Sequence, residues 1–486
     1  MIANIRTSIH AAIGKFRFRC SYAFFGSIIF VAIAATGQTV TPRSSEKPQY
    51  LSLGDPAGIN QARQAGDAQK LKTLSEASLP DLAKNYALAN YYRSIFEINL
   101  SSKYAKICYQ EGLTLLSDKH VEFYPVFCGE LLAGNYAIQG QVAKWARTMQ
   151  TARDKVYPFV VNLTHHANII FPNFGYIGAR IDMKDFYDFP VETITGNMAK
   201  NIVIQRVLST GKIPPSNAFN TGMCALNIKC FGPRYYYVQT NVNGHDLVAV
   251  LDTGTVESNV TPLEAKYLGI HVNPSPYYRI TSTQNVHAVA HLGYAQSIRI
   301  RTTAGHDIIL RNVPVMVGGE LPSDIPIVLG LDVLSKLARM SIRQDSIVVN
   351  PDAVDDQCDK LMHIQSTVNG GYTIFFEYPV DGRLQDVALD TGQNQYLFGT
   401  SLATATRASM DTVVIPQVRV TGVAQVAFYP ARVIFGSGAY ERHLTIPIFH
   451  SYQLIYPDPY VVGSDILQNY DIFLDFNHGK ACLMPK

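Results

Sequence analysis

The sequence predicts a mainly β protein in which two equivalent lobes follow an N-terminal α-helical region. Two observations predict the lobes: an apolar run that ends in Asp-Thr-Gly occurs twice, and a second apolar motif recurs downstream of each copy. A third observation predicts the helices, since apolar residues within residues 59–155 recur at helical spacing. An internal duplication of this kind sets the architecture of a chain.

The duplicated apolar runs, residues 248–254 and 387–392, indicate two buried strands that each lead into a turn. A carboxylate at the end of a buried strand is costly to desolvate unless it has partners. The two aspartates, Asp252 and Asp390, could therefore face each other and share one proton. A single Asp-Thr-Gly is an ordinary turn sequence that needs no chemistry, so the interpretation depends on what repeats around the two copies.

The residues before each copy repeat as a hairpin signal. The pairs Asn243-Gly244 and Asp381-Gly382 stand at the same distance before their Asp-Thr-Gly, and both are typical of two-residue hairpin turns. An aromatic and β-branched run precedes each pair, at residues 235–238 and 372–376. Each lobe is therefore predicted to begin with a strand, a hairpin turn, a second strand and then Asp-Thr-Gly.

The residues after each copy repeat as well. Residues 327–334 and 460–467 share the pattern apolar-apolar-Gly-x-Asp-[Val/Ile]-Leu, and strand-like runs follow at 339–350 and 470–476. We therefore expect one lobe over residues 231–352 and its equivalent over residues 353–486.

With both motifs in both halves, the chain resembles the aspartic protease family of the retropepsin and pepsin type over roughly residues 231–486. The lobes are nearer in length to a retropepsin protomer than to a pepsin lobe. The resemblance implies a double-lobe acid-protease fold of two pseudo-symmetric, retropepsin-like β-barrel lobes. It also implies an endopeptidase that is active as a single chain on polypeptide substrates, with no cofactor and no metal.

The resemblance assigns catalysis to Asp252 and Asp390, which would share one proton and activate a water molecule. It assigns support of this dyad to the residues that follow each aspartate, which are Thr253, Gly254, Thr391 and Gly392. The threonines would form hydrogen bonds between the lobes, and the glycines would allow the tight turn and a close backbone approach.

The sequence departs from the family after each Asp-Thr-Gly, where Ala or Ser is common and this chain has Thr255 and Gln393. Gln393 is the larger change. It leaves open an alternative function, a catalytically weak or inactive peptide-binding or scaffold protein with a protease-like fold. The flap that would cover a substrate has two candidate segments, residues 279–290 and 418–427, and no flap residue is assigned.

The N-terminus has the layout of a secretory signal peptide, predicted over residues 1–37. Basic residues precede an apolar stretch at residues 22–35, and small residues follow it. This layout predicts a secreted or periplasmic protein. An uncleaved, membrane-anchored signal remains the alternative. Residues 38–58 contain several prolines and little periodicity, and they are predicted to be a linker.

Residues 59–155 are predicted to be helical and resemble a degenerate tetratricopeptide-type array. Apolar residues lie three and four positions apart in two series, Leu88, Tyr92 and Ile95, and Val142, Trp145, Met149 and Ala152. Such an array could bind a protein partner, pack on the second half of the chain, or act as a prosegment. Residues 156–230 are predicted to be a mixed connecting segment.

Cysteine usage and charge restrict the remaining possibilities. Of seven cysteines, six follow the apolar N-terminal stretch, and their order suggests the pairs Cys108–Cys128, Cys224–Cys230 and Cys358–Cys482 among fifteen possible pairings. The net charge of +3 and the lack of a Lys/Arg run argue against nucleic acid as a partner. His165-His166 lacks acidic neighbours and is predicted to be ordinary surface rather than a metal site.

Overall fold

The computed structural model describes residues 58–64, 66–115, 124–156, 191–193, 201–207, 235–281, 287–303, 305, 307–318, 325–351, 358, 360–366, 372–393, 395–400, 403, 406–407, 412–419, 422–449 and 460–486. The predicted signal peptide, the predicted linker up to residue 57, the His165-His166 pair and the Cys224–Cys230 pair lie outside the described residues. Those predictions therefore stay predictions.

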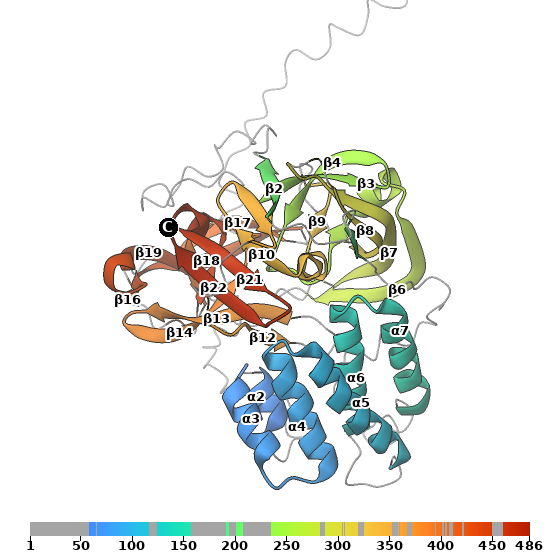
Figure 1. The fold of residues 1–486 in the computed structure, drawn as a ribbon. Helices are drawn as coiled ribbons and strands as arrows, with labels where there is room; N and C mark the ends of the chain where they lie inside the picture. Colours follow the sequence, from blue (N-terminus) through green and yellow to red (C-terminus); the bar gives the residue numbers. More distant parts are fainter. Residues whose placement is uncertain are drawn as a thin grey trace, which may run out of the picture. The chain divides into compact units, whose positions relative to one another are not determined.

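The N-terminal part of the described chain is helical (Figure 1). Its helices are α2 (Ile59–Gln64), α3 (Ala68–Glu76), α4 (Asp81–Ser94), α5 (Ile98–Thr114), α6 (Tyr124–Ile138) and α7 (Val142–Thr151), which continues as a π-helical turn over Ala152–Val156. Asp67 caps α3, because its side chain accepts a hydrogen bond of 2.8 Å from Lys70 N. Gly140, with φ +70°, follows the end of α6. Within the described residues, no helix is long and apolar enough to cross a membrane.

The two predicted apolar series differ in outcome. Trp145, Met149 and Ala152 are buried as expected, but Leu88, Tyr92 and Ile95 are only half-buried. The reason is that α4 contacts several neighbours, among them α3, α5 and α6, so its buried residues do not form one stripe. The predicted disulfide Cys108–Cys128 is confirmed and joins α5 to α6.

The strands form two sheets (Figure 1). The first sheet contains β1 (Val191–Thr193), β2 (Ile202–Val207), β3 (Tyr237–Val242), β4 (His245–Leu251), β5 (Asn259–Val260), β6 (His271–Thr281), β7 (His287–Ile300), β8 (Ile308–Val317), β9 (Val328–Leu329), β10 (Arg339–Ile342), β11 (Ser346–Val349), β21 (Tyr470–Asp475) and β22 (Lys480–Pro485). The second contains β12 (His363–Ser366), β13 (Tyr372–Val380), β14 (Arg383–Leu389), β15 (Leu397–Thr400), β16 (Thr406–Arg407), β17 (Val413–Arg419), β18 (Gly422–Phe435), β19 (Arg442–Phe449) and β20 (Tyr460–Val462). Short helices α11 (Pro262–Tyr267) and α12 (Leu331–Leu334) follow β5 and β9.

The two predicted hairpin turns are confirmed. β3 pairs with β4, and β13 pairs with β14, both antiparallel. Their turn residues have left-handed backbones, with φ +49° at Asn243 and +51° at Asp381, and positive φ at Gly244 and Gly382. Two successive positive φ values define the turn type whose twist matches a hairpin, which explains the Asn-Gly and Asp-Gly pairs.

Each turn is fastened to an equivalent long strand by the same pair of bonds. Asn243 N donates to Ser297 O at 3.0 Å, and Asn243 Oδ1 accepts from Ser297 N at 3.0 Å. Asp381 N donates to Ile434 O at 2.8 Å, and Asp381 Oδ1 accepts from Ile434 N at 2.7 Å. The internal duplication read from the sequence therefore extends to individual hydrogen bonds.

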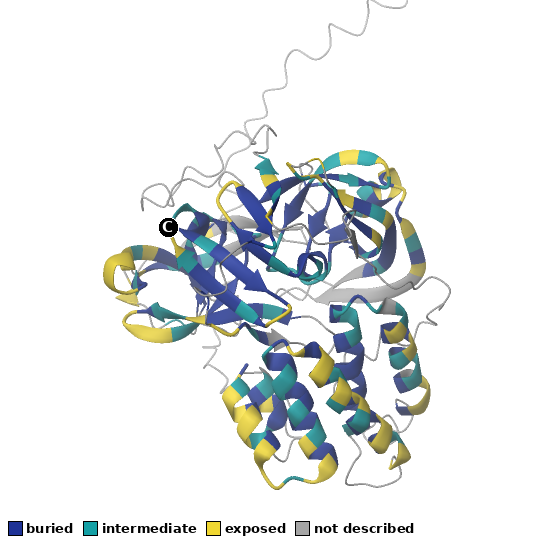
Figure 2. Ribbon diagram, in the orientation of Figure 1, coloured by how far each residue is buried: buried dark blue, intermediate teal, exposed yellow. Residues whose placement is uncertain are grey.

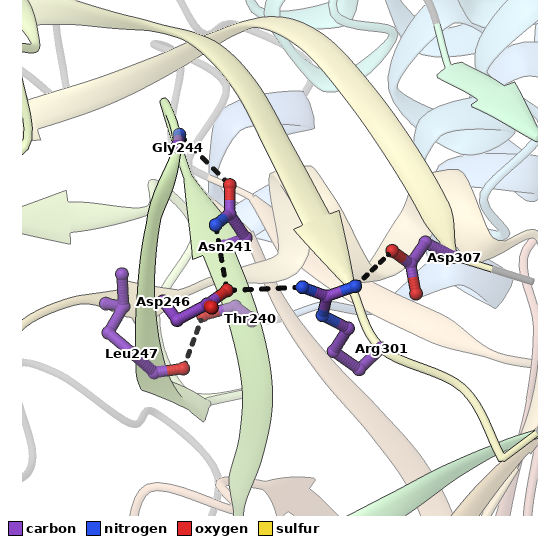
Figure 3. Close-up of polar contacts among 7 residues, drawn as sticks. All are labelled: Thr240, Asn241, Gly244, Asp246, Leu247, Arg301 and Asp307. Carbon is purple, nitrogen blue, oxygen red and sulfur yellow. Dashed lines mark hydrogen bonds and ion pairs between the residues drawn. The ribbon is translucent and has the colours of Figure 1, made fainter. Parts of the chain in front are cut away.

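A further polar network lies around the first hairpin (Figure 3). Asn241 Nδ2 donates to Asp246 Oδ1 at 2.8 Å across the two strands, and Asn241 Oδ1 accepts from Gly244 N at 3.0 Å. Arg301 forms ion pairs with two aspartates: its Nη2 lies 3.2 Å from Asp246 Oδ1, and its Nη1 lies 2.9 Å from Asp307 Oδ2. These exposed bonds add to the stability of the hairpin whose second strand leads to Asp252.

The first sheet draws on more of the chain than residues 231–352. β10 pairs antiparallel with β21, and β11 pairs with β2, which lies in the predicted connecting segment. Residues 339–350 are two strands joined by a turn, not one continuous run. Strands from the two predicted lobes thus share one sheet. The predicted disulfide Cys358–Cys482 is confirmed, with Cys482 in β22 of this sheet.

The protein core lies among these strands, which are mostly buried (Figure 2). One cluster of buried side chains includes strands of both sheets together with Phe96, Ile98 and Ile138 from the helical region. A second cluster holds most of the buried helical residues together with Leu292 and Tyr294 of β7. Helices and sheets are therefore packed on each other through apolar side chains.

Candidate active site

Each Asp-Thr-Gly lies at the end of a strand that has a parallel neighbour. β4 pairs in parallel with β9, and the bond from Asp252 N to Leu329 O, 3.0 Å long, extends this pairing into the loop. β14 pairs in parallel with β20, and Asp390 N donates to Val462 O at 3.0 Å. The second apolar motif of each repeat therefore holds the loop that carries the aspartate.

The two loops meet through their threonines, which are fully buried. Thr253 N donates to Thr391 Oγ1 at 3.0 Å, and Thr391 N donates to Thr253 Oγ1 at 2.9 Å. The hydroxyl of Thr391 also donates to Leu251 O at 3.1 Å. This reciprocal pattern satisfies two buried backbone donors and joins the two repeats.

The two carboxylates lie side by side on shared backbone donors. Asp252 Oδ1 accepts from Gly254 N at 2.7 Å and from Gly392 N, in the other loop, at 3.0 Å. The same Gly392 N–H also reaches Asp390 Oδ1 at 3.0 Å. The structure thus brings the two predicted catalytic aspartates together around one amide.

The glycines are required by this close approach. A Cβ on Gly254 would lie 2.8 Å from Asp390 Oδ2, and a Cβ on Gly392 would lie 2.5 Å from Asp252 Oδ1. Each glycine therefore faces the carboxylate of the opposite loop, and any side chain there would push that carboxylate away.

Burial raises the pKa of Asp252, and hydrogen bonds from Gly254, Asp390 and Gly392 act in the opposite direction. Asp390 is 3% exposed, whereas Asp252 is half-buried. A hydrogen bond between two carboxyl groups requires that one of them carries a proton. The site is thus suited to hold one proton between two carboxylates.

A second pair of glycines lies behind the loops. A Cβ on Gly330 would lie 2.9 Å from Thr255 O, and a Cβ on Gly463 would lie 2.6 Å from Gln393 O. Leu331 N donates to Thr255 O at 2.9 Å, and Ser464 N donates to Gln393 O at 2.7 Å. The backbone at Gln393 therefore makes the same bond as its equivalent, although its side chain departs from the family pattern.

One supporting pair was not predicted from the sequence. Asp332 accepts from Ser258 N at 2.9 Å and from Ser258 Oγ at 2.7 Å, and Ser258 Oγ accepts from Gly330 N at 3.1 Å. Burial raises the pKa of Asp332 to about 6 and that of the neighbouring Glu257 to about 7. The repeated Asp in the downstream motif was the available signal for Asp332. Ser258 has no repeated counterpart.

The two candidate flap segments are ends of β-hairpins. Residues 279–281 and 287–290 belong to the paired strands β6 and β7, and residues 418–419 and 422–427 belong to β17 and β18. The tips of both segments lie outside the described residues. Within the described residues, no group of three or more His, Cys, Asp or Glu side chains could hold a metal ion.

Residues 238–336 match the model of a family described as gag-polyprotein putative aspartyl protease. No match was found among curated proteins. Among solved structures, basic 7S globulin from soybean is 9% identical, covering 59% of this chain and 95% of the globulin at a TM-score of 0.33. Conglutin gamma from lupine seeds is 8% identical, covering 59% of this chain and 96% of its own at a TM-score of 0.33.

A retropepsin-like aspartic protease from Rickettsia conorii is 25% identical, covering 24% of this chain and 89% of its own at a TM-score of 0.19. These TM-scores are too low to bear on activity. The family match includes Asp252 and ends before Asp390. The first repeat of this mainly β chain is therefore similar to a family of aspartyl proteases.

Proposed function

We propose that this protein is an aspartic endopeptidase that hydrolyses peptide bonds with a water molecule activated by Asp252 and Asp390 in a single chain. The observation that carries the proposal is the N–H of Gly392, which donates at 3.0 Å to Oδ1 of both aspartates. Two carboxylates on one donor cannot both ionise easily, so they hold one proton between them. Thr253 and Thr391 hold the two loops in this arrangement.

Asp390 is less exposed than Asp252, and burial favours the neutral form of a carboxyl group, so we assign the shared proton to Asp390 and the ionised role to Asp252. In the proposed reaction, Asp252 takes a proton from the water as its oxygen bonds to the scissile carbonyl carbon. Asp390 gives its proton to the carbonyl oxygen. The C–N bond then breaks as Asp252 gives its proton to the leaving nitrogen and a hydroxyl of the tetrahedral diol gives its proton to Asp390, which restores one proton on the pair. No step needs a metal or a cofactor.

The protein is further proposed to act outside the cytoplasm, secreted or in the periplasm, with a membrane-anchored form as the alternative. Support comes from the signal-like N-terminal sequence and from the disulfides Cys108–Cys128 and Cys358–Cys482, which form in oxidising compartments. A protein partner could bind the tetratricopeptide-like helical region, since such arrays often present binding surfaces.

The alternative function is a peptide-binding or scaffold protein with little turnover, and Gln393 is the residue that favours it. Its backbone carbonyl keeps the bond to Ser464, so any effect of Gln393 on turnover would come from its side chain. A Gln393→Ser variant addresses this directly, because Ala or Ser is common at this position in the family. A gain in turnover in that variant would mean that Gln393 restrains the dyad.

The proposed activity is tested by incubating the mature chain with a mixed peptide library between about pH 3 and pH 7. Wild-type protein is expected to cleave internal peptide bonds, and Asp252→Asn is expected to lose at least about 100-fold in kcat/KM, because the amide cannot accept the water's proton. Peptides that bind to wild-type protein without being cut would favour the binding function. Cleavage that survives in Asp252→Asn would refute the mechanism.

A further inference from the structure

The helical region is packed against both predicted lobes. The ring of Phe96, which lies between α4 and α5, is centred 5.6 Å from the ring of Tyr372 and 5.3 Å from that of Phe476. Those two rings belong to the second predicted lobe. In the first predicted lobe, Tyr294 of β7 belongs to the same buried cluster as most of the buried helical residues. Gly479 also lies so close to Ile95 that a Cβ would come within 2.8 Å of its carbonyl oxygen. Such packing is typical of a permanent part of a fold.

One polar contact joins the helices to the segment behind Asp252. Lys336 lies in the helical turn that follows α12, and its Nζ donates to the carbonyl oxygen of Gln139, directly after the end of α6. Carbonyls at a helix C-terminus lack intrahelical partners and carry partial negative charge, so an ammonium group is favourable there. Ile138, the last residue of α6, is 6% exposed and packs in the core of the lobes.

From Lys336 a chain of contacts leads to the Asp252 loop. Lys336 stands four residues after Asp332 in the helical segment made of α12 and the turn that follows it, a spacing that places the two side chains on one face. Burial raises the pKa of Asp332, and the positive charge of Lys336 acts in the opposite direction. Asp332 binds both the amide and the hydroxyl of Ser258. That hydroxyl accepts from Gly330 N, and Gly330 lies directly against the carbonyl oxygen of Thr255 in the Asp252 loop. Other titratable groups that interact with Asp332 are Glu257 and Tyr372.

The second lobe is built differently at the same place. Counting from the repeated glycines, Asn469 occupies the position of Lys336, and Ser464 binds the loop carbonyl of Gln393 directly through its Oγ, at 3.0 Å. The contact with α6 is thus a feature of the first lobe. This asymmetry supplies an internal control, since a change at Lys336 should affect one loop and leave the other unchanged.

We propose that Lys336 is a positioning residue through which the end of α6 holds the Asp252 loop in its active conformation. The helical region would then support the active site permanently and would not be a prosegment that is removed. The effect on catalysis rests on the proposed endopeptidase function, but the effect on the loop does not. The two are separated by measuring the loop itself.

The test is amide hydrogen exchange of full-length wild-type protein and of Lys336→Met, Lys336→Arg and Lys144→Met. Lys144 is a matched control, because this exposed lysine of α7 makes local side-chain contacts: its Nζ donates to Gln141 Oε1 at 2.8 Å and lies 5.6 Å from the ring centre of Tyr136. In Lys336→Met, the segment around Ser258 should exchange about tenfold faster, since a charge-assisted bond is lost. The Asp390 segment should keep its wild-type rate, and Lys336→Arg should restore protection around Ser258.

Unchanged exchange around Ser258 in Lys336→Met, or equal acceleration in both loops, would overturn the proposal. If Lys336→Met does not fold, Ile138→Ala loosens the same end of α6 and must give the same one-sided acceleration. In a cleavage assay, Lys336→Met should lower kcat with little change in KM, because the loop and not the substrate contact is altered. A wild-type protein without cleavage would refute the endopeptidase and leave the exchange result valid.

Discussion

At the scale of single residues, the candidate site depends on atoms that few other side chains could supply. Thr391 offers a hydroxyl that accepts from one buried amide and donates to one buried carbonyl at the same time. Gly392 offers an amide to two carboxylates and leaves no room for a side chain. The repeated Asp-Thr-Gly therefore reflects geometry at each of its three positions.

Thr391→Val is predicted to destabilise the protein, while Thr391→Ser should be close to wild type. Valine has the same shape but leaves the buried amide of Thr253 without its acceptor, at a cost of about 1–3 kcal/mol. Serine keeps the hydroxyl. Denaturant unfolding of the two variants measures the difference. Equal stability of valine and serine variants would mean that the hydroxyl is not needed.

Gly392→Ala is predicted to lower kcat/KM by at least about 100-fold, because the new methyl group displaces the carboxylate of Asp252. Gly382→Ala is the control, since its positive φ makes alanine strained there but no atom lies near the new methyl group. The control should lose stability and keep its activity. Similar activity in both variants would contradict the close approach of the two loops.

At the scale of elements, the hairpin turns before each aspartate set the direction of the strands. Asn243→Ala is predicted to destabilise the fold by about 1–3 kcal/mol, because alanine at positive φ is strained and the bond to Ser297 N is lost. Asp381→Asn should cost less than about 1 kcal/mol, since asparagine keeps both the acceptor and the tolerance for this backbone. Equilibrium unfolding of each variant measures the loss in the free energy of unfolding. A larger loss in Asp381→Asn than in Asn243→Ala would contradict this role of the turn residues.

Much of the arrangement of strands and turns could be predicted from the sequence. Asn243-Gly244 and Asp381-Gly382 are residue pairs that favour positive φ at two successive positions, so they predict their hairpins. Cys358 and Cys482 flank a repeat and were paired correctly. The partners of β2 and the division of residues 339–350 into two strands were not predictable, because strand pairing depends on contacts between distant segments. The contact of Lys336 with Gln139 could not be predicted from the sequence for a different reason. Its acceptor is a backbone carbonyl, which any residue could provide.

At the scale of the whole molecule, buried carboxyl groups predict how stability depends on pH. Burial raises the pKa of Glu130 from 4.5 to about 8, and that of Glu257 from 4.5 to about 7. The folded state therefore binds more protons than the unfolded state between these values, so the free energy of unfolding falls as pH rises through this window.

The protein is accordingly predicted to be more stable near pH 5 than near pH 8, by on the order of a few kcal/mol. Chemical unfolding at several pH values measures the slope, and Glu130→Gln should flatten it because glutamine stays neutral. A stability that rises between about pH 5 and pH 8 would contradict the burial of these groups.

In the proposed function, two lobes of one chain supply one catalytic dyad. Its second member, Asp390, lies outside residues 238–336, the stretch that matches a family of aspartyl proteases. The most direct test is therefore kcat/KM of Asp390→Asn relative to wild type, at equal folded concentration. We predict a loss of at least about 100-fold with the thermal unfolding midpoint little changed, because asparagine keeps an acceptor for Gly392 N. Cleavage near the wild-type rate in Asp390→Asn would show that Asp252 works without Asp390, and would contradict the single-chain dyad.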